Sequence, residues 1–326
     1  MRRLRVVAIG GGTGLYTLLK GMREYDLDLT AIVAMTDDGG STGELRDEFG
    51  ILPPGDVRRC IVALSESPEM MKELFQYRFI KGAVAGHSFG NLFITALREL
   101  TGSDEQAISE AARLLRVKGK VYPVTLENRR LQAELENGEI IIGETNIDIP
   151  KHDPNLKIKR LFLNSPAKIN PKALKAINRA DMIILGPGDL YGSVIANLLV
   201  SGMSRAIRHS RATIVYICNL MTKYGETNNY TVEDFMRSLE KYLGKGVLDY
   251  VIVGNLRLDK KTKAIYAREH ADPVRFTLAN PKEFSCRFVQ ARIAAKGNLL
   301  RHDSQKLAKI IWSLLQIDNK LTFVEF

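Results

Sequence analysis

Short apolar runs alternate with longer amphipathic stretches along most of this 326-residue chain. The short runs have the length of β-strands, and the stretches between them repeat apolar residues every three or four positions, as helices packed on a core do. Such alternation favours a mostly parallel sheet flanked by helices, an α/β fold. Strands are expected at 4–9, 29–35, 158–163, 182–185, 214–217 and 250–253. Helices are expected near 14–24, 56–65, 69–78, 89–101, 104–115, 171–179, 193–208, 231–242 and 304–316.

The interval 118–149 does not follow this alternation of strands and helices. Three short runs with alternating apolar residues lie there, at 121–126, 131–135 and 139–142. Alternation is typical of strands with one buried face. Asn137 and Gly138 separate the last two runs, and Asn-Gly is a preferred pair for a two-residue hairpin turn. The pattern therefore predicts a small antiparallel β insertion at 118–149.

The composition is that of an ordinary globular protein, with 45% apolar and 26% charged residues. The length allows one large α/β domain or two smaller ones. A net charge of +10 favours acidic ligands, with phosphate the obvious candidate. Nucleic acid is not expected as a partner, because the basic residues are spread out and no aromatic-basic recognition motif is present. The basic tract 257–263 is expected to be a solvated hairpin end.

Cysteine usage and hydropathy bear on the location of the protein. Cys60, Cys218 and Cys286 are widely separated and odd in number, which argues for reduced thiols in the cytosol. No apolar run approaches the roughly 20 residues that a bilayer span requires. A cytoplasmic protein without a membrane span is therefore expected.

A glycine-rich turn follows the first expected strand directly, and its residues are Gly10, Gly11, Gly12, Thr13 and Gly14. Glycine lets backbone N–H groups approach an anion closely, and the helix that begins near Leu15 adds a favourable dipole. The alternating glycines match neither the G-x-G-x-x-G dinucleotide fingerprint nor the P-loop. The turn predicts a phosphate site, and the alternative is a tight strand-to-helix turn that binds nothing.

Polar and glycine-rich segments also follow other expected strands. An open α/β sheet binds ligands outside the carboxyl ends of its strands, near the point where strand order reverses. Asp37 and Asp38 follow the second strand, Gly186 and Gly188 follow the strand at 182–185, and Asn219 and Thr222 follow the strand at 214–217. We expect these residues to contact the same nucleotide or sugar-phosphate ligand.

Acidic residues near the glycine turn suggest a cation or a ribose. Asp37 and Asp38 suit a ribose hydroxyl or Mg²⁺ held beside phosphates, although aspartate and glycine also favour turns for backbone reasons. Asp38 is the preferred candidate. Asp56 either caps the helix that follows it or shares the cation with Asp38. Arg58 or its neighbour Arg59 would meet phosphate oxygens.

The segment from Gly86 to Asn91 spells G-x-S-x-G around Ser88, the nucleophile elbow of α/β-hydrolases. An elbow needs a well-formed strand directly before the serine, and only the short run 83–85 is available there. Alternatively, Ser88 caps the helix from 89 while His87 and Asn91 face a ligand. A serine hydrolase with Ser88 as its nucleophile is the minor alternative.

Six motifs together suggest a family. They are GGGTG at 10–14, DDGGSTG at 37–43, LPPGDVRRC at 52–60, GHSFGNL at 86–92, LGPGDLYGS at 185–193 and NLMTKYGET at 219–227. In this order the motifs resemble the YvcK-type gluconeogenesis factors of the CofD-like superfamily. The resemblance covers most of residues 4–230, and the C-terminal third is less diagnostic.

The resemblance implies a Rossmann-like α/β fold, a single CofD-like domain over 1–326 with the insertion at 118–149, and a nucleotide-binding cleft. The YvcK-like branch is associated with cell morphogenesis and wall synthesis on gluconeogenic carbon and with binding of UDP-sugars. The other branch is a 2-phospho-L-lactate transferase, which uses Mg²⁺ and releases a guanine nucleotide. Asp38 and Asp56 stand at the motifs where that branch has metal-binding aspartates. The DDGGS continuation departs from the acidic-aromatic one of the transferases.

Two functions follow from the resemblance. The leading hypothesis is a cytoplasmic nucleotide-sugar-binding regulatory protein, with a UDP-sugar as ligand and GDP or NAD as alternatives. The second is a Mg²⁺-dependent transferase of the 2-phospho-L-lactate transferase type. No residue is assigned a catalytic role, and homo-oligomerisation is left open.

Overall fold

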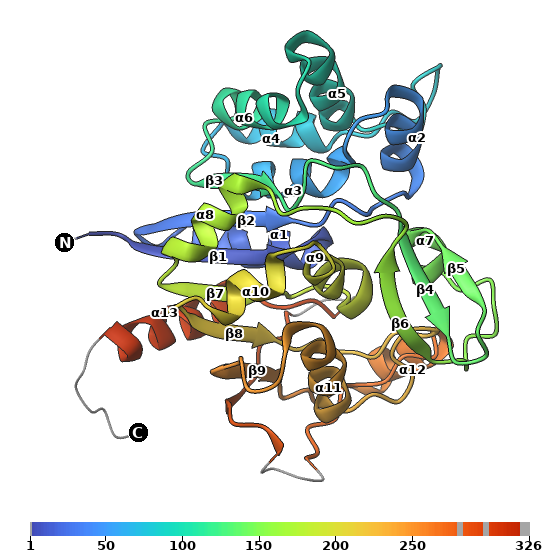
Figure 1. Cartoon of the computed structure of the whole chain (residues 1–326), viewed down its shortest axis with the longest axis vertical. Coiled ribbons are helices and arrows are strands. Elements are labelled where there is room, and N and C mark those ends of the chain that lie inside the picture. The colour runs from blue at the N-terminus through green and yellow to red at the C-terminus, as the bar shows by residue number, and fades with distance from the viewer. Residues whose placement is uncertain (1, 279–282, 296–299, 320–326) are drawn as a thin grey trace.

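A seven-stranded sheet forms the centre of the molecule (Figure 1). The computed structural model of the chain describes residues 2–278, 283–295 and 300–319. The strand order is β10-β9-β8-β7-β1-β2-β3, and each pair of neighbours is parallel. The strands are β1 Leu4–Gly10, β2 Leu27–Val33, β3 Lys120–Pro123, β7 Met182–Leu185, β8 Thr213–Ile217, β9 Tyr250–Gly254 and β10 Arg287–Ala291. The expectation of a mostly parallel α/β sheet is confirmed.

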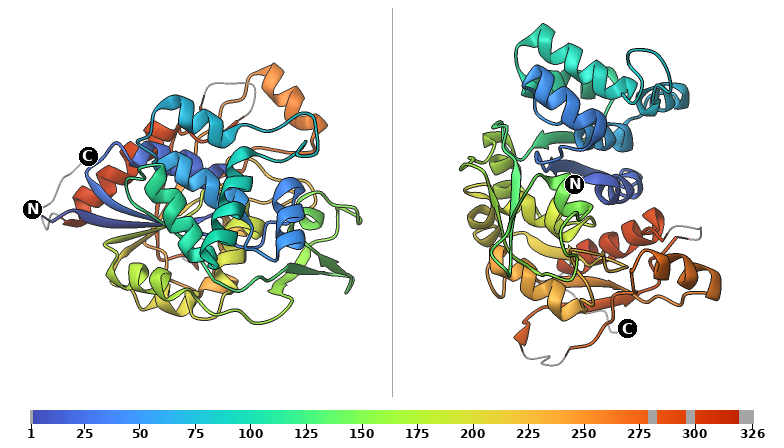
Figure 2. Two further views of the ribbon diagram at one scale, coloured as in Figure 1. Left: turned by 90° about the horizontal axis from the view of Figure 1, so that it is seen from above. Right: turned by 90° about the vertical axis from the view of Figure 1, so that its right-hand side faces the viewer.

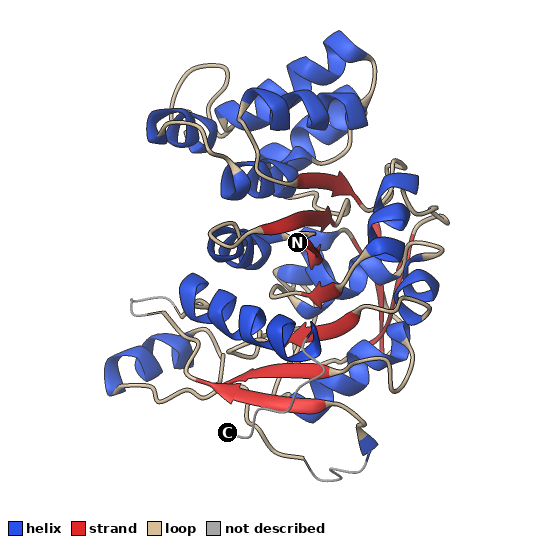
Figure 3. Cartoon of the chain, turned by 90° about the vertical axis from the view of Figure 1, so that its left-hand side faces the viewer, coloured by secondary structure: helices blue, strands red, loops and turns tan. Residues whose placement is uncertain are grey.

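Helices cover both faces of this sheet, as the edge-on view shows (Figure 3). Helices α1, α3 and α13 pack together on one face, and α8, α10 and α11 pack on the other. The central strands are therefore apolar on both sides, and Val6 to Ile9 of β1 are all buried. A further group, α2, α4, α5 and α6, lies beyond the β3 edge (Figures 1 and 2).

The helices are α1 Gly12–Met22, α2 Gly40–Phe49, α3 Pro54–Leu64, α4 Glu69–Gln76, α5 Phe89–Thr101, α6 Asp104–Leu114, α7 Glu144–Asp148, α8 Pro171–Arg179, the π-helix η1 Leu190–Ile195, α9 Ala196–Leu198, α10 Met203–Arg208, α11 Val232–Leu243, α12 Lys260–Arg268 and α13 Ser304–Asn319. Local signals explain several of their ends. The side chain of Asn170 accepts a hydrogen bond from the Lys172 N–H and caps α8. Thr231 and Asp234 form a capping box at α11.

Some elements differ from the expectations. The single helix expected at 193–208 is three pieces, η1, α9 and α10, and α2, α7 and α12 were not expected. Helix α12 replaces the hairpin end expected at 257–263. It begins after Asp259, whose side chain accepts a hydrogen bond from the Thr262 N–H. Tyr266 is its buried residue, so the helix lacks the apolar stripe that reveals a helix in a sequence.

A small antiparallel sheet lies beside the main one, in the order β5-β4-β6. Its strands are β4 Leu131–Leu135, β5 Ile140–Ile142 and β6 Ile158–Leu163. The predicted hairpin between β4 and β5 is confirmed. Two assignments to sheets were wrong: the run at 121–126 contributes β3 to the main sheet, and the run at 158–163 pairs with β4. A short apolar run indicates a buried strand but does not indicate which strand it pairs with.

The strand order reverses at the centre of the main sheet. From β1 the chain proceeds outward through β2 to β3, and it then returns to β7 on the other side of β1. The carboxyl ends of β1 and β7 are therefore the place where an open α/β sheet leaves a crevice between diverging connections.

Candidate functional site

A cleft of about 710 Å³ lies at this reversal point. Most of the predicted site residues line it, namely Gly11, Gly12, Thr13, Gly14, Asp37, Asp56, Arg58, Asn91, Gly188, Asn219 and Thr222. Five other predicted residues do not line it, namely Gly10, Asp38, His87, Ser88 and Gly186. Segments far apart in the sequence thus meet at the carboxyl edge of the sheet, in the region that the strand-end argument indicates.

Backbone conformation and close packing both require glycine in the turn after β1. Gly12 has a φ of +63°, in the left-handed region that favours glycine. A Cβ at Gly14 would lie 2.3 Å from the carbonyl oxygen of Pro187. The turn after β1 and the turn after β7 therefore pack directly on one another. The backbone at the start of α1 is left facing the cleft.

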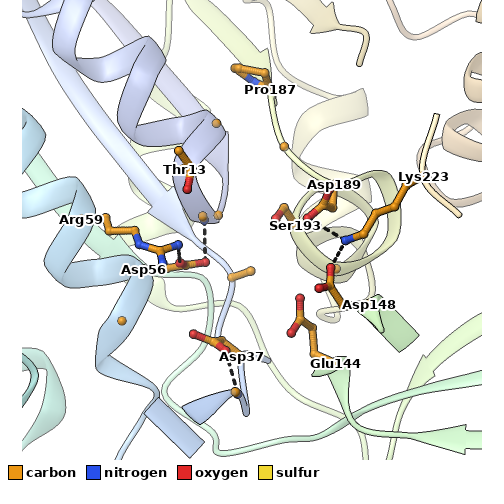
Figure 4. Close-up of a pocket in the computed structure, with 18 of the residues that line it drawn as sticks. Thr13, Asp37, Asp56, Arg59, Glu144, Asp148, Pro187, Asp189, Ser193 and Lys223 are labelled. Atoms are coloured by element: carbon orange, nitrogen blue, oxygen red, sulfur yellow. Dashed lines mark hydrogen bonds and ion pairs between the residues drawn. The ribbon is translucent and has the colours of Figure 1, made fainter. Parts of the chain in front are cut away.

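Asp56 lies on α3, but its carboxylate bonds the backbone at the start of α1. Its Oδ2 accepts a hydrogen bond from the Gly12 N–H at 2.6 Å, and its Oδ1 lies 3.3 Å from Nη1 of Arg59 (Figure 4). Helix α3 itself begins after Pro53, so Asp56 is not its cap. Burial, and then the charge of Asp37, raise the pKa of Asp56 to about 6. We call the residues Gly11 to Gly14, Asp37, Asp56 and Arg59 the glycine wall.

The opposite side of the cleft is rich in carboxylates, and we call Glu144, Asp148, Asp189 and Lys223 the acidic wall (Figure 4). Burial is the main cause of a pKa of about 8 at Glu144, and the charges of Asp37 and Asp56 raise it further. Burial also raises the pKa of Asp189. Like charges that share a cleft favour bound protons or a bound cation.

Lys223 is the cation within the acidic wall. Its Nζ forms ion pairs with Asp148, with Asp189 at 3.3 Å and with Glu226 at 3.2 Å. Burial raises the pKa of Glu226 to about 7. Its second carboxyl oxygen and the Oδ1 of Asn219 are buried without a hydrogen-bond partner among the described residues. Asn219 lines the cleft and Glu226 does not, so the Asn219 oxygen is an acceptor at the cleft without a donor among the described residues.

Asp37 and Asp38 contact different elements. The Oδ1 of Asp37 accepts a hydrogen bond from the Gly39 N–H at 3.0 Å, and burial raises the pKa of this cleft-lining carboxyl. The Oδ1 of Asp38 accepts one from the Thr145 N–H at 2.9 Å, and its Oδ2 lies 3.4 Å from Nη1 of Arg130. Asp38 thus ties the loop after β2 to the small sheet and α7. The geometry brings Asp37, and not the preferred Asp38, beside Asp56.

A metal site is not formed by the side chains as they stand. Among the described residues, no group of three or more His, Cys, Asp and Glu side chains is arranged to hold a metal ion. Asp37 and Asp56 are the carboxylates on the glycine wall that could contact a cation brought by a ligand, because the charge of Asp37 raises the pKa of Asp56. Mg²⁺ binding through one or two carboxylates plus ligand phosphates has this form.

Ser88 is a helix cap. It is fully buried, and its Oγ accepts a hydrogen bond from the Asn91 N–H at the start of α5. His87 does not contact it through the imidazole, because Nδ1 lies 3.0 Å from Oγ of Ser41. Asn91 does line the cleft, and its Oδ1 accepts a hydrogen bond from Nε of Arg58 at 2.9 Å. This geometry supports the capping role and gives a nucleophilic Ser88 no access to the cleft.

Several cleft residues were missed by the sequence analysis. Asp189 and Lys223 stand in the motifs after β7 and β8, where a charged residue at a strand end was an available signal. Glu144 comes from α7, and Tyr266 and Arg301 come from the C-terminal third. Nothing in their local sequence marks these three, because long-range folding brings them to the cleft.

Comparisons with known proteins agree with the fold and the motifs. The sequence profile of the family described as 2-phospho-L-lactate transferase CofD matches residues 6–294. The gluconeogenesis factor of Halalkalibacterium halodurans is 42% identical over 95% of this chain and 96% of its own length. That of Bacillus subtilis is 39% identical over 96% of this chain and 98% of its own length.

A solved structure and the helix lengths complete the comparison. The crystal structure of a protein from Bacillus halodurans is 40% identical, covers 95% of this chain and 100% of that chain, and superposes with a TM-score of 0.91. No helix among the described residues has the length and apolarity that crossing a membrane would take. The chain therefore belongs to the 2-phospho-L-lactate transferase CofD family and, within it, to the gluconeogenesis factors.

Proposed function

We propose that the cleft binds a nucleotide sugar, with the diphosphate at the start of α1. The observation that carries this proposal is the glycine turn that opens α1 onto the cleft. Gly12 gives its N–H to Asp56, whereas the N–H groups of Thr13 and Gly14 have no acceptor among the described residues. Free N–H groups at a helix N-terminus favour an anion, and Arg58 and Arg59 add positive charge nearby.

The size and the remaining lining support a ligand larger than phosphate. A volume of about 710 Å³ lies in the range of small-molecule pockets, and Tyr266 and Arg301 line the same cleft as the glycine turn. An aromatic ring and a guanidinium group suit a base or a sugar. The choice of uridine comes from the resemblance to the UDP-sugar-binding branch, and GDP and NAD are the alternatives to be tested.

We infer the cellular role from the resemblance to the YvcK-like branch. As a gluconeogenesis factor, the protein would be a cytoplasmic regulator of cell morphogenesis and wall synthesis during growth on gluconeogenic carbon. In this role the bound nucleotide sugar reports the supply of a wall precursor. Mg²⁺ would accompany the diphosphate and neutralise Asp37 and Asp56, since the charge of Asp37 raises the pKa of Asp56.

Calorimetric titration tests the proposal. We expect heat and a thermal shift with UDP-N-acetylglucosamine or UDP-glucose in Mg²⁺, and weaker effects with GDP and NAD, because a ligand that binds the native state stabilises it. Arg301→Ala should weaken binding at least tenfold. Arg268→Ala, which removes an exposed arginine outside the cleft, is the matched control. No heat and no shift with any of the four ligands would overturn the proposal.

The second candidate is a Mg²⁺-dependent group transferase. The observation in its favour is that Asp56 and Glu144, with pKa values of about 6 and about 8, share one cleft. Carboxyls whose pKa values lie near neutrality can exchange protons with a substrate at neutral pH. Asp37→Asn and Asp56→Asn should abolish turnover while the fold survives. Turnover that persists unchanged after metal removal would contradict this candidate.

A further inference from the structure

A chain of three hydrogen bonds and one close histidine–glutamate contact passes from Arg58 to Glu44 beside the cleft. Nε of Arg58 donates to Oδ1 of Asn91 at 2.9 Å, and Nδ2 of Asn91 donates to Oγ of Ser41 at 3.2 Å. Oγ of Ser41 lies 3.0 Å from Nδ1 of His87, and Nε2 of His87 lies 3.2 Å from Oε2 of Glu44. The proposed nucleotide site makes no use of Ser41, His87 or Glu44.

The arginine determines the direction of the chain. A guanidinium group only donates hydrogen bonds, and Arg58 keeps its proton at neutral pH even though burial lowers its pKa to about 10. Asn91 must therefore present its oxygen to Arg58 and its amide nitrogen to Ser41. Because the amide nitrogen only donates, Ser41 accepts in this bond and its own proton is free for another partner.

That proton has an acceptor in His87. When Ser41 donates to Nδ1, the neutral imidazole carries its proton on Nε2, which lies 3.2 Å from Oε2 of Glu44. The serine, the imidazole and the carboxylate then have the roles of a Ser-His-acid triad, with the two ring nitrogens used in the opposite order. A nucleophile bonded to a base that a third group orients is the signature of an activated hydroxyl.

The placement of the three residues matches these roles. Ser41 is the second residue of α2 and lines the cleft, whereas His87 and Glu44 stand behind it and do not. The N-terminus of a helix stabilises negative charge that develops on the serine oxygen. Ser41 is 5% exposed, so bulk water reaches its hydroxyl only through the cleft.

We propose that Ser41 is a nucleophile, with His87 as its base and Glu44 as a positioning residue. The substrate class is an electrophilic phosphorus centre, and this part rests on the proposed function because it needs a phosphate ester in the cleft. The Oγ–P bond forms, the bond from phosphorus to the leaving oxygen breaks, and the serine proton passes through Nδ1 of His87 to that oxygen. Water then cleaves the serine ester by the reverse sequence.

Diisopropyl fluorophosphate tests the nucleophile without knowledge of the natural substrate. Attack by Ser41 forms the Oγ–P bond and expels fluoride, and His87 takes the proton. We expect intact mass and peptide mapping of the full chain at pH 8 to find one diisopropyl phosphoryl group on Ser41. His87→Gln should slow labelling about 100-fold. Two variants should label at the wild-type rate. They are His209→Gln, which replaces an exposed histidine whose Nδ1 lies 2.8 Å from the Arg205 carbonyl oxygen, and Ser313→Ala.

Glu44 needs a separate readout, because its side chain is 64% exposed. Glu44→Gln should slow labelling roughly twofold to fivefold, the size expected for an exposed charged partner. Glu44→Asp, which keeps the carboxylate, should recover part of the rate that Glu44→Gln loses. A wild-type rate in Glu44→Gln, or no recovery in Glu44→Asp, would remove Glu44 from the proposal.

The outcomes separate this inference from the proposed function. Folded wild-type protein that is not labelled on Ser41 overturns the inference, and so does labelling at equal rates in wild type and His87→Gln. Titration of the same preparation with UDP-N-acetylglucosamine reports the nucleotide site independently. Binding without labelling therefore supports the proposed function and contradicts the nucleophile. Labelling without binding supports the nucleophile and contradicts the proposed function. Labelling of Ser41 in the wild-type protein tests the inference even if a variant fails to fold.

Discussion

The glycine wall and the acidic wall face each other across one cleft, and both contain buried carboxyl groups (Figure 4). On the glycine wall, Asp56 accepts a hydrogen bond from the Gly12 N–H and pairs with Arg59, and its pKa is about 6. On the acidic wall, the Glu144 carboxyl has no hydrogen-bond donor among the described residues, and its pKa is about 8. The hydrogen-bond donors around Asp56, and not a difference in burial alone, therefore account for the difference between these two pKa values.

This difference gives the walls different tasks. The glycine wall offers an anion backbone N–H groups, whose charge does not depend on pH, and Asp56 accepts one of them. The acidic wall changes its charge near neutral pH, because Glu144 has a pKa of about 8. Glu226, which pairs with Lys223 behind this wall, has a pKa of about 7. The first wall fits a diphosphate, and the second responds to protons and cations.

Gly14→Ala should break the glycine wall. The added Cβ would meet the carbonyl oxygen of Pro187 at 2.3 Å, and two backbone segments cannot separate without repacking. We expect a loss of about 3 kcal/mol in the free energy of unfolding, measured in urea. Gly10→Ala is the control, because its Cβ would meet no atom closer than 3.8 Å. Similar losses in both variants would contradict the packing role of Gly14.

Glu144→Gln should stabilise the acidic wall at high pH. Burial raises the pKa of Glu144 from 4.5 to about 8, so the folded state binds this proton more tightly than the unfolded state. The contribution of the group is complete below pH 4.5 and is lost as pH rises through 8. The variant should gain about 2 kcal/mol over wild type above pH 8 and nothing near pH 4.5.

Urea unfolding across this pH range measures the difference. The exposed Glu139→Gln is the matched control and should follow wild type throughout. A gain that does not vary with pH would show that the burial of the Glu144 charge is not its source.

The neighbouring aspartates can be distinguished through Mg²⁺. In saturating nucleotide, Mg²⁺ at about 100 times its dissociation constant should stabilise wild type by about 2.7 kcal/mol. Asp37→Asn should lose most of this gain, because Asp37 lines the cleft. Asp38→Asn should keep it, because that carboxylate bonds Thr145 and Arg130 instead. Thermal shifts with and without Mg²⁺ decide the matter, and the reverse pattern would restore Asp38 as the cation ligand.

Ser88→Ala should have the smallest effect and should leave both walls unchanged. It removes the cap of α5, and we expect a loss of about 1 kcal/mol in the free energy of unfolding. The affinity for the nucleotide, measured by calorimetry, should match that of wild type because Ser88 does not line the cleft. A large loss of affinity would give Ser88 a part in the site.

Much of the main sheet could be predicted because its strands are buried on both faces. The runs at 4–9 and 182–185 are continuous and apolar, and each is followed by glycine. Strand β10 was missed, because its residues are only half-buried or exposed and its apolar pattern is weak. Helix α2 was missed as well, because it begins inside the glycine-rich DDGGSTG motif, which is typical of a loop.

Residues of the cleft could be predicted where the backbone conformation or its packing requires glycine, as at Gly12 and Gly14. Prediction was poorer where two similar side chains were both candidates for one contact. Ser88 and Ser41 illustrate this. The G-x-S-x-G pattern points to Ser88, but the imidazole of His87 lies beside Ser41, 46 positions earlier in the chain. A hydrogen bond between helix α2 and the loop before α5 leaves no periodic signal in either segment.

The sequence by itself determined the alternation of strands and helices, the glycine turn at the start of α1 and the family. These are local consequences of burial and backbone conformation, which act over a few residues. Only the tertiary structure decided that β3 joins the main sheet, that β6 joins the small one, and that Asp37 rather than Asp38 faces Asp56. Strand pairing and the orientation of adjacent side chains depend on contacts between distant segments, so they become definite only when the chain is packed.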